Sequence, residues 1–325
     1  MRRSLPTPPD FAFGSAVCSH GFFVLAPNRW DAAARTLHTA VALDEDRAAA
    51  VSIREQSPHR LGVRVDASLF GDQTDAVVAA VRRILRLDED LSPFHVLCRR
   101  RPSHRRAAMS RFGRLLRSES FFEDLVKVIC TCNVGWGQTV GMIERIVAHW
   151  GIPTTDGCAR SFPTPDRLAR ASVADLRRFA RVGYRAPFIR DAARAVAEGS
   201  LDLIALEHFD GPADERYRRL RAIRGVGDYA ASHLCMLAGD YTRLAVDTEM
   251  VRLLRARYPR TRLTPARIRD LYRPWHPYEY LAYWYELWSD YVRRHGQSDQ
   301  WSAADQGTRI TSRRRSTGTS ASDGG

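Results

Sequence analysis

The chain has 325 residues, of which 44% are hydrophobic and 27% are charged, as in globular proteins that bury a core. No stretch approaches the roughly 20 apolar residues of a membrane-spanning helix, and the N-terminus lacks the apolar run of a signal peptide, so we expect a cytoplasmic protein. The formal net charge of +13 indicates a polyanionic partner, above all nucleic acid.

Residues 1–98 are predicted to form an N-terminal antiparallel sheet domain. The apolar run 22–26 and the alternating apolar residues of 61–65 are typical of strands. Apolar residues recur at helical spacing over 72–89, which predicts an amphipathic helix that covers the sheet.

Residues 99–117 contain eight arginines and no acid, and this shift in composition marks a boundary. We interpret the segment as an Arg-rich linker. It is either a solvated connection or an arm that contacts phosphates.

Residues 118–295 are predicted to be helical almost throughout, which indicates an all-α domain after the sheet and an α+β fold for the chain. Residues 296–325 are rich in Ser, Thr and Gly and are predicted to form a disordered tail, whose Arg313–Arg315 would hold DNA weakly. The expected helices are 121–132, 136–149, 165–169, 173–180, 187–197, 214–222, 228–238, 248–257, 264–271 and 277–294.

The six cysteines are scattered along the chain, without a C-x-x-C pair or a four-cysteine cluster. This spacing does not fit the usual zinc or iron–sulfur patterns. We therefore expect reduced thiols, no iron–sulfur cluster and no other metal site.

Two short motifs near the C-terminal end carry the chemical argument. Gly225-Val226-Gly227 predicts a tight turn between two helices, with Val226 as a plug between them. The free N–H groups of the second helix could then approach a phosphate closely, because the glycines have no side chain. About twenty residues later an apolar run ends at Asp247, which is either a plain helix N-cap or a functional carboxylate.

Together these motifs resemble the helix-hairpin-helix DNA glycosylase superfamily, in which a hairpin of this form is followed by V-D-T at a helix start. The segment I-C-T-C-N at 129–133, F-P at 162–163 and G-Y-R-A at 183–186 resemble the 8-oxoguanine branch. A sheet ahead of the helical domain agrees with both the 8-oxoguanine and the alkyladenine branches. The resemblance implies an N-terminal sheet domain followed by a helix-hairpin-helix glycosylase domain over 118–295.

The resemblance implies a role for several residues, and each has a simpler alternative. Asp247 would be the catalytic carboxylate, with its pKa lowered by the helix dipole and N–H groups. Asn133 would fill the gap left by a flipped nucleotide, or it caps or breaks a helix. Tyr184 would be an intercalating wedge, or a core aromatic. Arg185 would contact the base left behind, or pair with a surface acid.

The resemblance also shows where this chain departs from the family. Bifunctional members carry a lysine two residues after the second hairpin glycine, and here that position is Tyr229, which lines the base pocket or simply packs. Lys127, the only lysine of the chain, falls on a predicted packed helix. Gln138 stands where the 8-oxoguanine branch has an arginine that reads the opposite base, and His233 either packs or lines the pocket.

The helix over 277–294 is dense in aromatic residues, with Leu281, Trp284, Trp288 and Tyr291 on one stripe. Core packing is the default interpretation of such a stripe. In similar glycosylases the equivalent helix supplies an aromatic that stacks on the flipped base, which makes Tyr280, Tyr283 or Trp284 a candidate.

We therefore predict a monomeric, monofunctional DNA glycosylase that acts on double-stranded DNA with a damaged base, a purine by resemblance, and that is nucleoid-associated if the source is bacterial. No cofactor is expected, although the resemblance allows a monovalent cation at the hairpin carbonyls. The alternative function is that of a non-catalytic protein that binds damaged or unusually structured DNA, because the catalytic lysine is missing.

Overall fold

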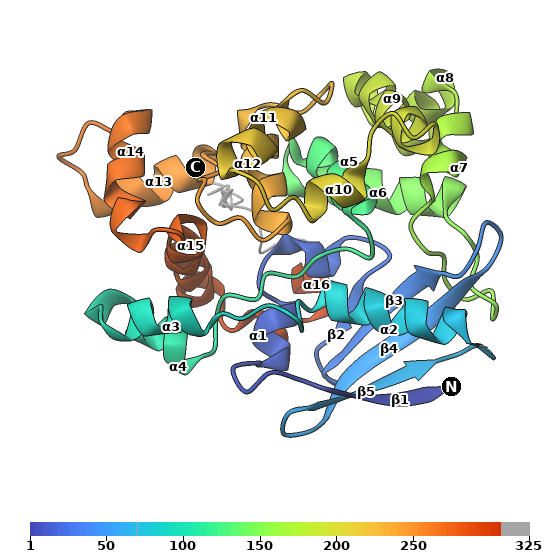
Figure 1. Ribbon diagram of the computed structural model, residues 1–325, viewed down its shortest axis with the longest axis horizontal. Helices are drawn as coiled ribbons and strands as arrows, with labels where there is room; N and C mark the ends of the chain where they lie inside the picture. The colour runs from blue at the N-terminus through green and yellow to red at the C-terminus, as the bar shows by residue number, and fades with distance from the viewer. Residues whose placement is uncertain (70, 307–325) are drawn as a thin grey trace, which may run out of the picture.

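The computed structural model describes residues 1–69 and 71–306 (Figure 1). A five-stranded antiparallel sheet near the N-terminus is followed by a body of helices, which confirms the predicted α+β fold class. No helix in the described part of the chain is long and apolar enough to cross a membrane.

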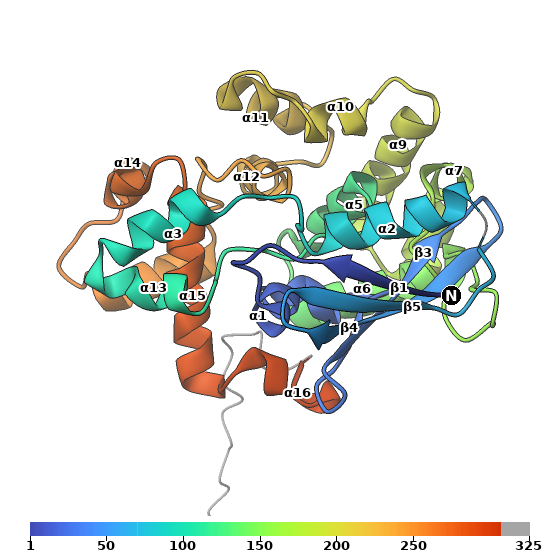
Figure 2. The same cartoon turned by 60° about the horizontal axis from the view of Figure 1, so that its bottom comes forward.

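The sheet has the strand order β1-β5-β4-β3-β2, and all neighbouring strands are antiparallel. The side chains that alternate over 61–65 are buried as predicted. Helix α2 (Asp72–Ile84) lies along the sheet and buries Val77, Val81 and Ile84 (Figure 2). The strands are β1 (Arg2–Pro6), β2 (Arg29–Asp31), β3 (Thr36–Ala42), β4 (Ala48–Ser57) and β5 (Arg60–Val65).

The strand predicted over 22–26 is wrong, because Gly21–Val24 form a short 3₁₀ helix. Phe22, Phe23 and Leu25 are all buried, so consecutive side chains face the core and no polar face is left for alternation. The ring of Phe22 lies against the helical body, 6.1 Å from the ring of His233. This segment therefore joins the sheet to the helices.

The helical body follows the predicted helices closely. The sequence pattern does not predict helices α1, α3, α4, α10 and α16, because runs of four to eight residues are too short to show a period. The helices are α1 (Phe13–Val17), α3 (Ser92–Arg99), α4 (Arg105–Met109), α5 (Phe121–Thr131), α6 (Trp136–Trp150), α7 (Pro165–Arg170), α8 (Val173–Asp175), α9 (Ala186–Ala197), α10 (Leu203–Glu207), α11 (Ala213–Arg221), α12 (Asp228–Leu237), α13 (Thr248–Arg257), α14 (Pro265–Tyr272), α15 (Glu279–His295) and α16 (Ala303–Gln306).

The Arg-rich segment 99–117 is folded against the rest of the protein. Arg114 is buried and donates hydrogen bonds to Glu89 O (2.7 Å) and to the Asp10 carboxylate (2.6 Å). Arg117 pairs with Glu207 at 3.2 Å. These arginines stabilise contacts between distant parts of the chain, so neither a solvated connection nor a DNA-contacting arm describes the whole segment.

The predicted disorder over 296–325 is wrong for the part that the structure describes. Trp301 is buried and donates its indole N–H to the His295 and Gly296 carbonyls at 3.1 and 3.2 Å. Its ring packs on Trp288 of α15, with centroids 6.2 Å apart. A large aromatic in a polar segment anchors it to the core. Arg313–Arg315 lie outside the described residues.

Candidate functional site

The loop between α5 and α6 presents Asn133 at the surface. The backbone of Asn133 is left-handed (φ +53°), a conformation that asparagine tolerates better than most residues. The side chain is exposed, and its Nδ2 donates to the hydroxyl of Tyr184 at 3.4 Å. Asn133 therefore ends the α5 segment and also lies beside the predicted wedge.

Tyr184 and Arg185 follow one another in a 3₁₀ turn ahead of α9. Tyr184 is 52% exposed, so it is not a core aromatic. Arg185 is buried, stacks over the Tyr184 ring at 4.5 Å, and donates to the carbonyl of Cys132. Arg185 holds Tyr184 and the Asn133 loop together, and no surface acid pairs with it in the described ranges.

The hairpin between α11 and α12 has the predicted form. Gly225 is left-handed (φ +90°), and a Cβ there would lie 2.6 Å from the Phe188 ring. Val226 is buried between the helices, while Gly227 has open space where a Cβ would point. Gly225 is therefore needed for the turn itself, whereas Gly227 leaves the backbone N–H groups at the start of α12 accessible.

Asp247 is the N-cap of α13. Its Oδ1 accepts a hydrogen bond from Met250 N at 2.8 Å, as an N-cap carboxylate should. The predicted lowering of its pKa is wrong. Burial raises the pKa of Asp247, with Glu249 adding to the effect, and this outweighs the N–H groups of the helix start that act in the opposite direction.

One groove of about 1320 Å³ collects residues that lie far apart in the sequence. Its walls come from the α5–α6 loop, the 3₁₀ turn before α9, the hairpin and the start of α13. Of the predicted site residues, it is lined by Asn133, Gln138, Tyr184, Arg185, Gly225, Gly227, Tyr229 and Asp247. Val226, His233 and Trp284 do not line it, and Val226 is buried behind the hairpin surface.

Stacked aromatic rings extend from the groove into the core. The Tyr229 ring stacks on His233 with centroids 5.8 Å apart, and His233 Nδ1 lies 3.1 Å from the Tyr280 hydroxyl. Tyr280 stacks in turn on Trp284 at 5.8 Å. The hydroxyl of Tyr283 is buried with no hydrogen-bond partner in the described residues. Tyr229 is thus the outermost ring of an aromatic wall behind Asp247.

Sequence reasoning missed the part of this wall that comes from the N-terminal segment. The ring of His20 lies 6.3 Å from His233 and 6.1 Å from Trp284. Gly21 lets the indole of Trp136 approach to a distance at which no Cβ would fit. In the sequence, the feature that points to these contacts is the pair His20-Gly21 at the start of an apolar run.

The two buried histidines are neutral near pH 7. Burial lowers the pKa of His233 to about 4, and burial together with the neighbouring His233 lowers the pKa of His20 to about 3. Burial and the nearby Asp247 raise the pKa of Tyr229. The wall behind Asp247 therefore offers neutral rings and hydrogen-bonding groups, without a positive charge of its own.

Lys127 is buried in α5, as predicted. Its Nζ lies 2.6 Å from the Glu123 carboxylate and 5.6 Å from the centre of the Phe22 ring. Lys127 does not line the groove. All six cysteines are free thiols, and the described residues contain no group of three or more His, Cys, Asp or Glu side chains placed to bind a metal.

The two hairpin glycines should respond differently to alanine. Gly225→Ala should lower the free energy of unfolding by about 2 to 4 kcal/mol, because Ala tolerates neither the positive φ nor the contact with Phe188. Gly227→Ala should leave it within about 0.5 kcal/mol. It should instead weaken binding to duplex DNA roughly tenfold, the equivalent of one lost charge-assisted hydrogen bond.

Chemical denaturation and fluorescence anisotropy with a labelled duplex measure the two quantities separately. Equal loss of stability in both variants, or unchanged DNA affinity of Gly227→Ala, would contradict this assignment of the hairpin.

No protein-family model matches the chain. It is 26% identical over 168 residues to DNA-3-methyladenine glycosylase 2 of Escherichia coli (strain K12), which covers 50% of this chain and 57% of that protein. It is 30% identical over 143 residues to N-glycosylase/DNA lyase of Saccharomyces cerevisiae, covering 40% of this chain and 38% of that protein. The chain thus spans about half the length of the curated relatives that it matches.

Solved structures resemble almost the whole chain. MBOgg1 in complex with a low-affinity DNA ligand superposes with a TM-score of 0.72 at 22% identity, over 91% of this chain and 96% of that one. The apo form of Clostridium acetobutylicum 8-oxoguanine glycosylase/lyase gives 0.70 at 17% identity, over 88% and 96%. The 3-methyladenine DNA-glycosylase of Archaeoglobus fulgidus gives 0.67 at 19% identity, over 91% and 99%. The predicted resemblance is confirmed: the chain has the fold of the helix-hairpin-helix DNA glycosylases, in the form that has an N-terminal sheet.

Proposed function

We propose that this protein is a monofunctional DNA glycosylase that removes a damaged base from double-stranded DNA. The observation that carries the proposal is the groove, in which the hairpin glycines, the exposed Tyr184 with Asn133, and the Asp247 carboxylate meet. The relatives named for 3-methyladenine and 8-oxoguanine support a damaged purine as the substrate class. The net charge of +13 supports DNA as the partner.

The residues that line the groove would hold DNA with one nucleotide flipped out. A base inside a duplex cannot be reached, so its nucleotide must leave the stack. The N–H groups at the start of α12, next to Gly227, would hold the backbone phosphates. Tyr184, backed by Arg185, would fill the space that the nucleotide leaves, with Asn133 at its side.

The reaction that follows from the site is hydrolysis of the N-glycosidic bond. As the C1′–N bond breaks, its electrons go to the base and the sugar becomes oxocarbenium-like. The ionised Asp247 stabilises that cation, and water adds its oxygen to C1′ while its proton passes to the carboxylate. A half-buried carboxylate is more effective in this role than a solvated one, since little water screens it.

A pure DNA-binding function is the competing proposal. Asp247 argues against it, because a negative charge beside a phosphate backbone weakens binding, and burial makes this charge costly to hold. The absence of an amine at Tyr229 does not separate the two functions, because a glycosylase that uses water needs none.

Replacing Asp247 should separate catalysis from folding. Asp247→Asn should slow base release at least roughly 100-fold, because it removes the charge that stabilises the sugar cation. Asn caps helices as well as Asp does, so the Met250 hydrogen bond should persist. The folded-state pKa of Asp247 is raised, so its ionisation lowers stability as the pH rises through that pKa, and the variant should be at least as stable as the wild type at pH 7.

Single-turnover base release followed by alkaline strand scission measures the loss, with thermal unfolding run in parallel. Asp228→Asn is the matched control, since Asp228 also lines the groove but is paired with Arg221 at 2.7 Å. A fully active Asp247→Asn protein would rule out the proposed role.

Activity should fall at acid pH with a midpoint above the usual aspartate value of 3.8, because Asp247 must be ionised and its pKa is raised. Glu249→Gln should move this limb to lower pH, since Glu249 is the negative neighbour that adds to the shift. The pH profile of kcat/KM measures both. An acid limb that stays in place in Glu249→Gln would mean that another group controls it.

The protein should leave an abasic site without cutting the strand. Tyr229 cannot form a Schiff base, and the only lysine, Lys127, is buried beside Glu123, so borohydride should trap no covalent adduct with DNA. Tyr229→Lys places an amine in the groove near Asp247 and should give a trapped adduct as a positive control. Trapping by the wild-type protein would contradict the monofunctional assignment.

A further inference from the structure

A second charged surface begins beside Tyr184. The π-helical turn Leu176–Ala180 and the residue after it expose Arg177, Arg178, Phe179 and Arg181, and we call these four residues the flank patch. Phe179 is 37% exposed and lies between the arginines. Exposed aromatic and guanidinium groups side by side are typical of nucleic-acid contact surfaces.

The flank patch is fixed to the helical body. Leu176, Ala180 and Val182 are buried on the inner side of the same segment. Arg145 of α6 donates from Nε to the Ala180 carbonyl at 3.2 Å. The His149 ring of α6 lies 5.0 Å from that of Phe179. The backbone that carries the arginines of the flank patch is therefore fixed by packing against the helical body.

The arginines of the flank patch carry free charge. Within residues 1–69 and 71–306, no carboxylate pairs with them, and the contact recorded for Arg178 is with the Phe179 ring at 5.2 Å. Asp175, the acid of the preceding helix, accepts from the Ser172 hydroxyl at 2.7 Å. Free guanidinium groups bind phosphates at the smallest cost in lost ion pairs.

The hairpin side of the groove differs in this respect. Three of the five arginines on α11 and the turn after it are closely paired with an acid, and the exposed Arg218 donates only to the Asp214 carbonyl, so most of the side-chain charge there is neutralised and backbone N–H groups are left to hold phosphates. The pairs are Arg219 with Glu215, Arg221 with Asp228 at 2.7 Å, and Arg224 with Asp191 at 2.6 Å. The free positive charge next to Tyr184 is thus that of the flank patch.

Arg181 ends the π-helical turn as its C-cap residue. Its backbone is left-handed (φ +56°), where glycine would avoid a cost of about 1 kcal/mol. Its side chain is exposed and makes no hydrogen bond, ion pair or ring contact within the described segments. The left-handed conformation is a common way for a helical turn to end, and the exposed guanidinium of Arg181 stays available to a partner.

The flank patch is joined to the groove through Tyr184, which follows it by three residues and lines the groove. Phe188 packs under Gly225 of the hairpin, and its ring lies 6.2 Å from that of Tyr184. Phe188 therefore connects the hairpin to Tyr184, and Arg181 precedes Tyr184 by three residues in the chain. DNA that reaches from the hairpin to the wedge would extend onto the patch.

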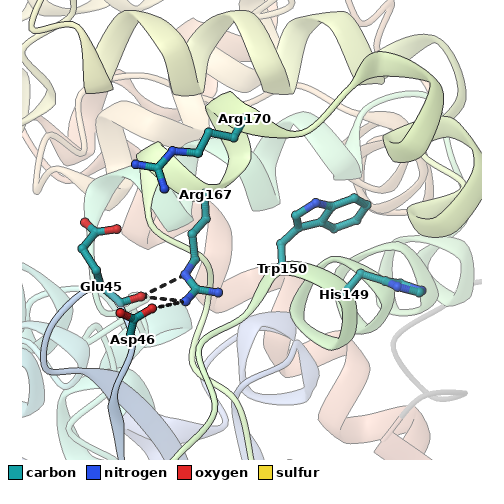
Figure 3. Close-up of a pocket in the computed structure, with 6 residues that line it drawn as sticks. All are labelled: Glu45, Asp46, His149, Trp150, Arg167 and Arg170. Atoms are coloured by element: carbon teal, nitrogen blue, oxygen red, sulfur yellow. Dashed lines mark hydrogen bonds and ion pairs between the residues drawn. The ribbon is translucent and has the colours of Figure 1, made fainter.

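Figure 3 shows a cavity on the other side of His149, the residue whose ring lies against Phe179. A cavity of about 430 Å³ at the end of α6 is lined by His149, Trp150, Arg167 and Arg170 on one side and by Glu45 and Asp46 on the other. Arg167 reaches across to Glu45 O (2.7 Å) and to the Asp46 carboxylate (3.0 Å). The charge of Arg167 is therefore neutralised by Asp46, and we place the end of the DNA contact before this pair.

We propose that the flank patch binds the phosphate backbone of the duplex next to the flipped nucleotide, on the opposite side of Tyr184 from the hairpin. The proposal rests on the proposed glycosylase function but concerns a different surface. Each arginine neutralises one phosphate and releases condensed counterions, so the patch contributes to affinity and to its dependence on salt, but not to the chemical step.

The test uses the full chain and an undamaged labelled duplex, so that it does not depend on base release. Arg177→Ala/Arg178→Ala should weaken binding roughly tenfold and reduce the slope of log K against log salt by about 2. Arg181→Gly should reduce the slope by about 1 while its unfolding midpoint stays equal or rises, because Gly suits the positive φ. The DNA-saturated rate of base release should be unchanged in both.

The matched control is Arg267→Ala/Arg269→Ala, which removes the same charge from exposed positions on α14, at the opposite end of the molecule from α8 (Figure 1). Shortening the duplex at the end that would lie on the flank patch should lower the affinity and the salt slope of the wild type to those of the patch variants. Shortening it at the other end should not. Slopes equal to the wild type, or losses no larger than in the α14 control, would overturn the proposal. Failure to release any base would instead refute only the proposed function.

Discussion

The site depends on the negative charge of Asp247, which some interactions stabilise and others destabilise. The N-cap geometry and the N–H of Met250 stabilise the carboxylate, while burial and Glu249 destabilise it enough to raise its pKa. A helix start that served only to end a loop would gain more from a solvated cap. Held where little water screens it, the carboxylate can act strongly on a positive charge that forms nearby.

The scaffold brings the partners of Asp247 together by ordinary helix packing. Asn133 follows the buried helix α5, Tyr184 precedes α9, and the hairpin glycines join α11 to α12, so each functional residue lies at a helix end fixed by a buried stripe. The N-terminal part of the chain contributes as well, because His20 and Phe22, at the 3₁₀ helix ahead of β2, reach the ring of His233. The wall behind the groove is therefore shared between the two parts of the fold.

Much of this arrangement could be predicted from the sequence, because it is encoded by patterns of residues that are close together in the chain. The helices have periodic apolar faces, and the hairpin is encoded by glycines that have a conformational task, notably Gly225 at φ +90°. The resemblance supplied the positions of Asp247, Tyr184 and Asn133, which the structure places in one groove. Their individual roles stay predictions.

The remaining features depend on contacts between distant residues, which no local pattern encodes. Residues 22–26 look like a strand but fold as a 3₁₀ helix, because the helical body covers several consecutive side chains. Arg114 and Trp301 lie in segments that read as linker and tail, yet both are buried by partners far along the chain. The pKa of Asp247 was mispredicted for the same reason, since the helix start is visible in the sequence and the burial is not.

The central claim is that Asp247 faces the sugar of an extrahelical nucleotide. A crystal structure of the protein with a duplex that carries a tetrahydrofuran abasic-site analogue tests it most directly. We expect the tetrahydrofuran ring to lie in the groove against the free carboxylate oxygen of Asp247, with Tyr184 inserted in the duplex and the phosphates at Gly227. A duplex bound on another face, or a sugar ring turned away from Asp247, would contradict it.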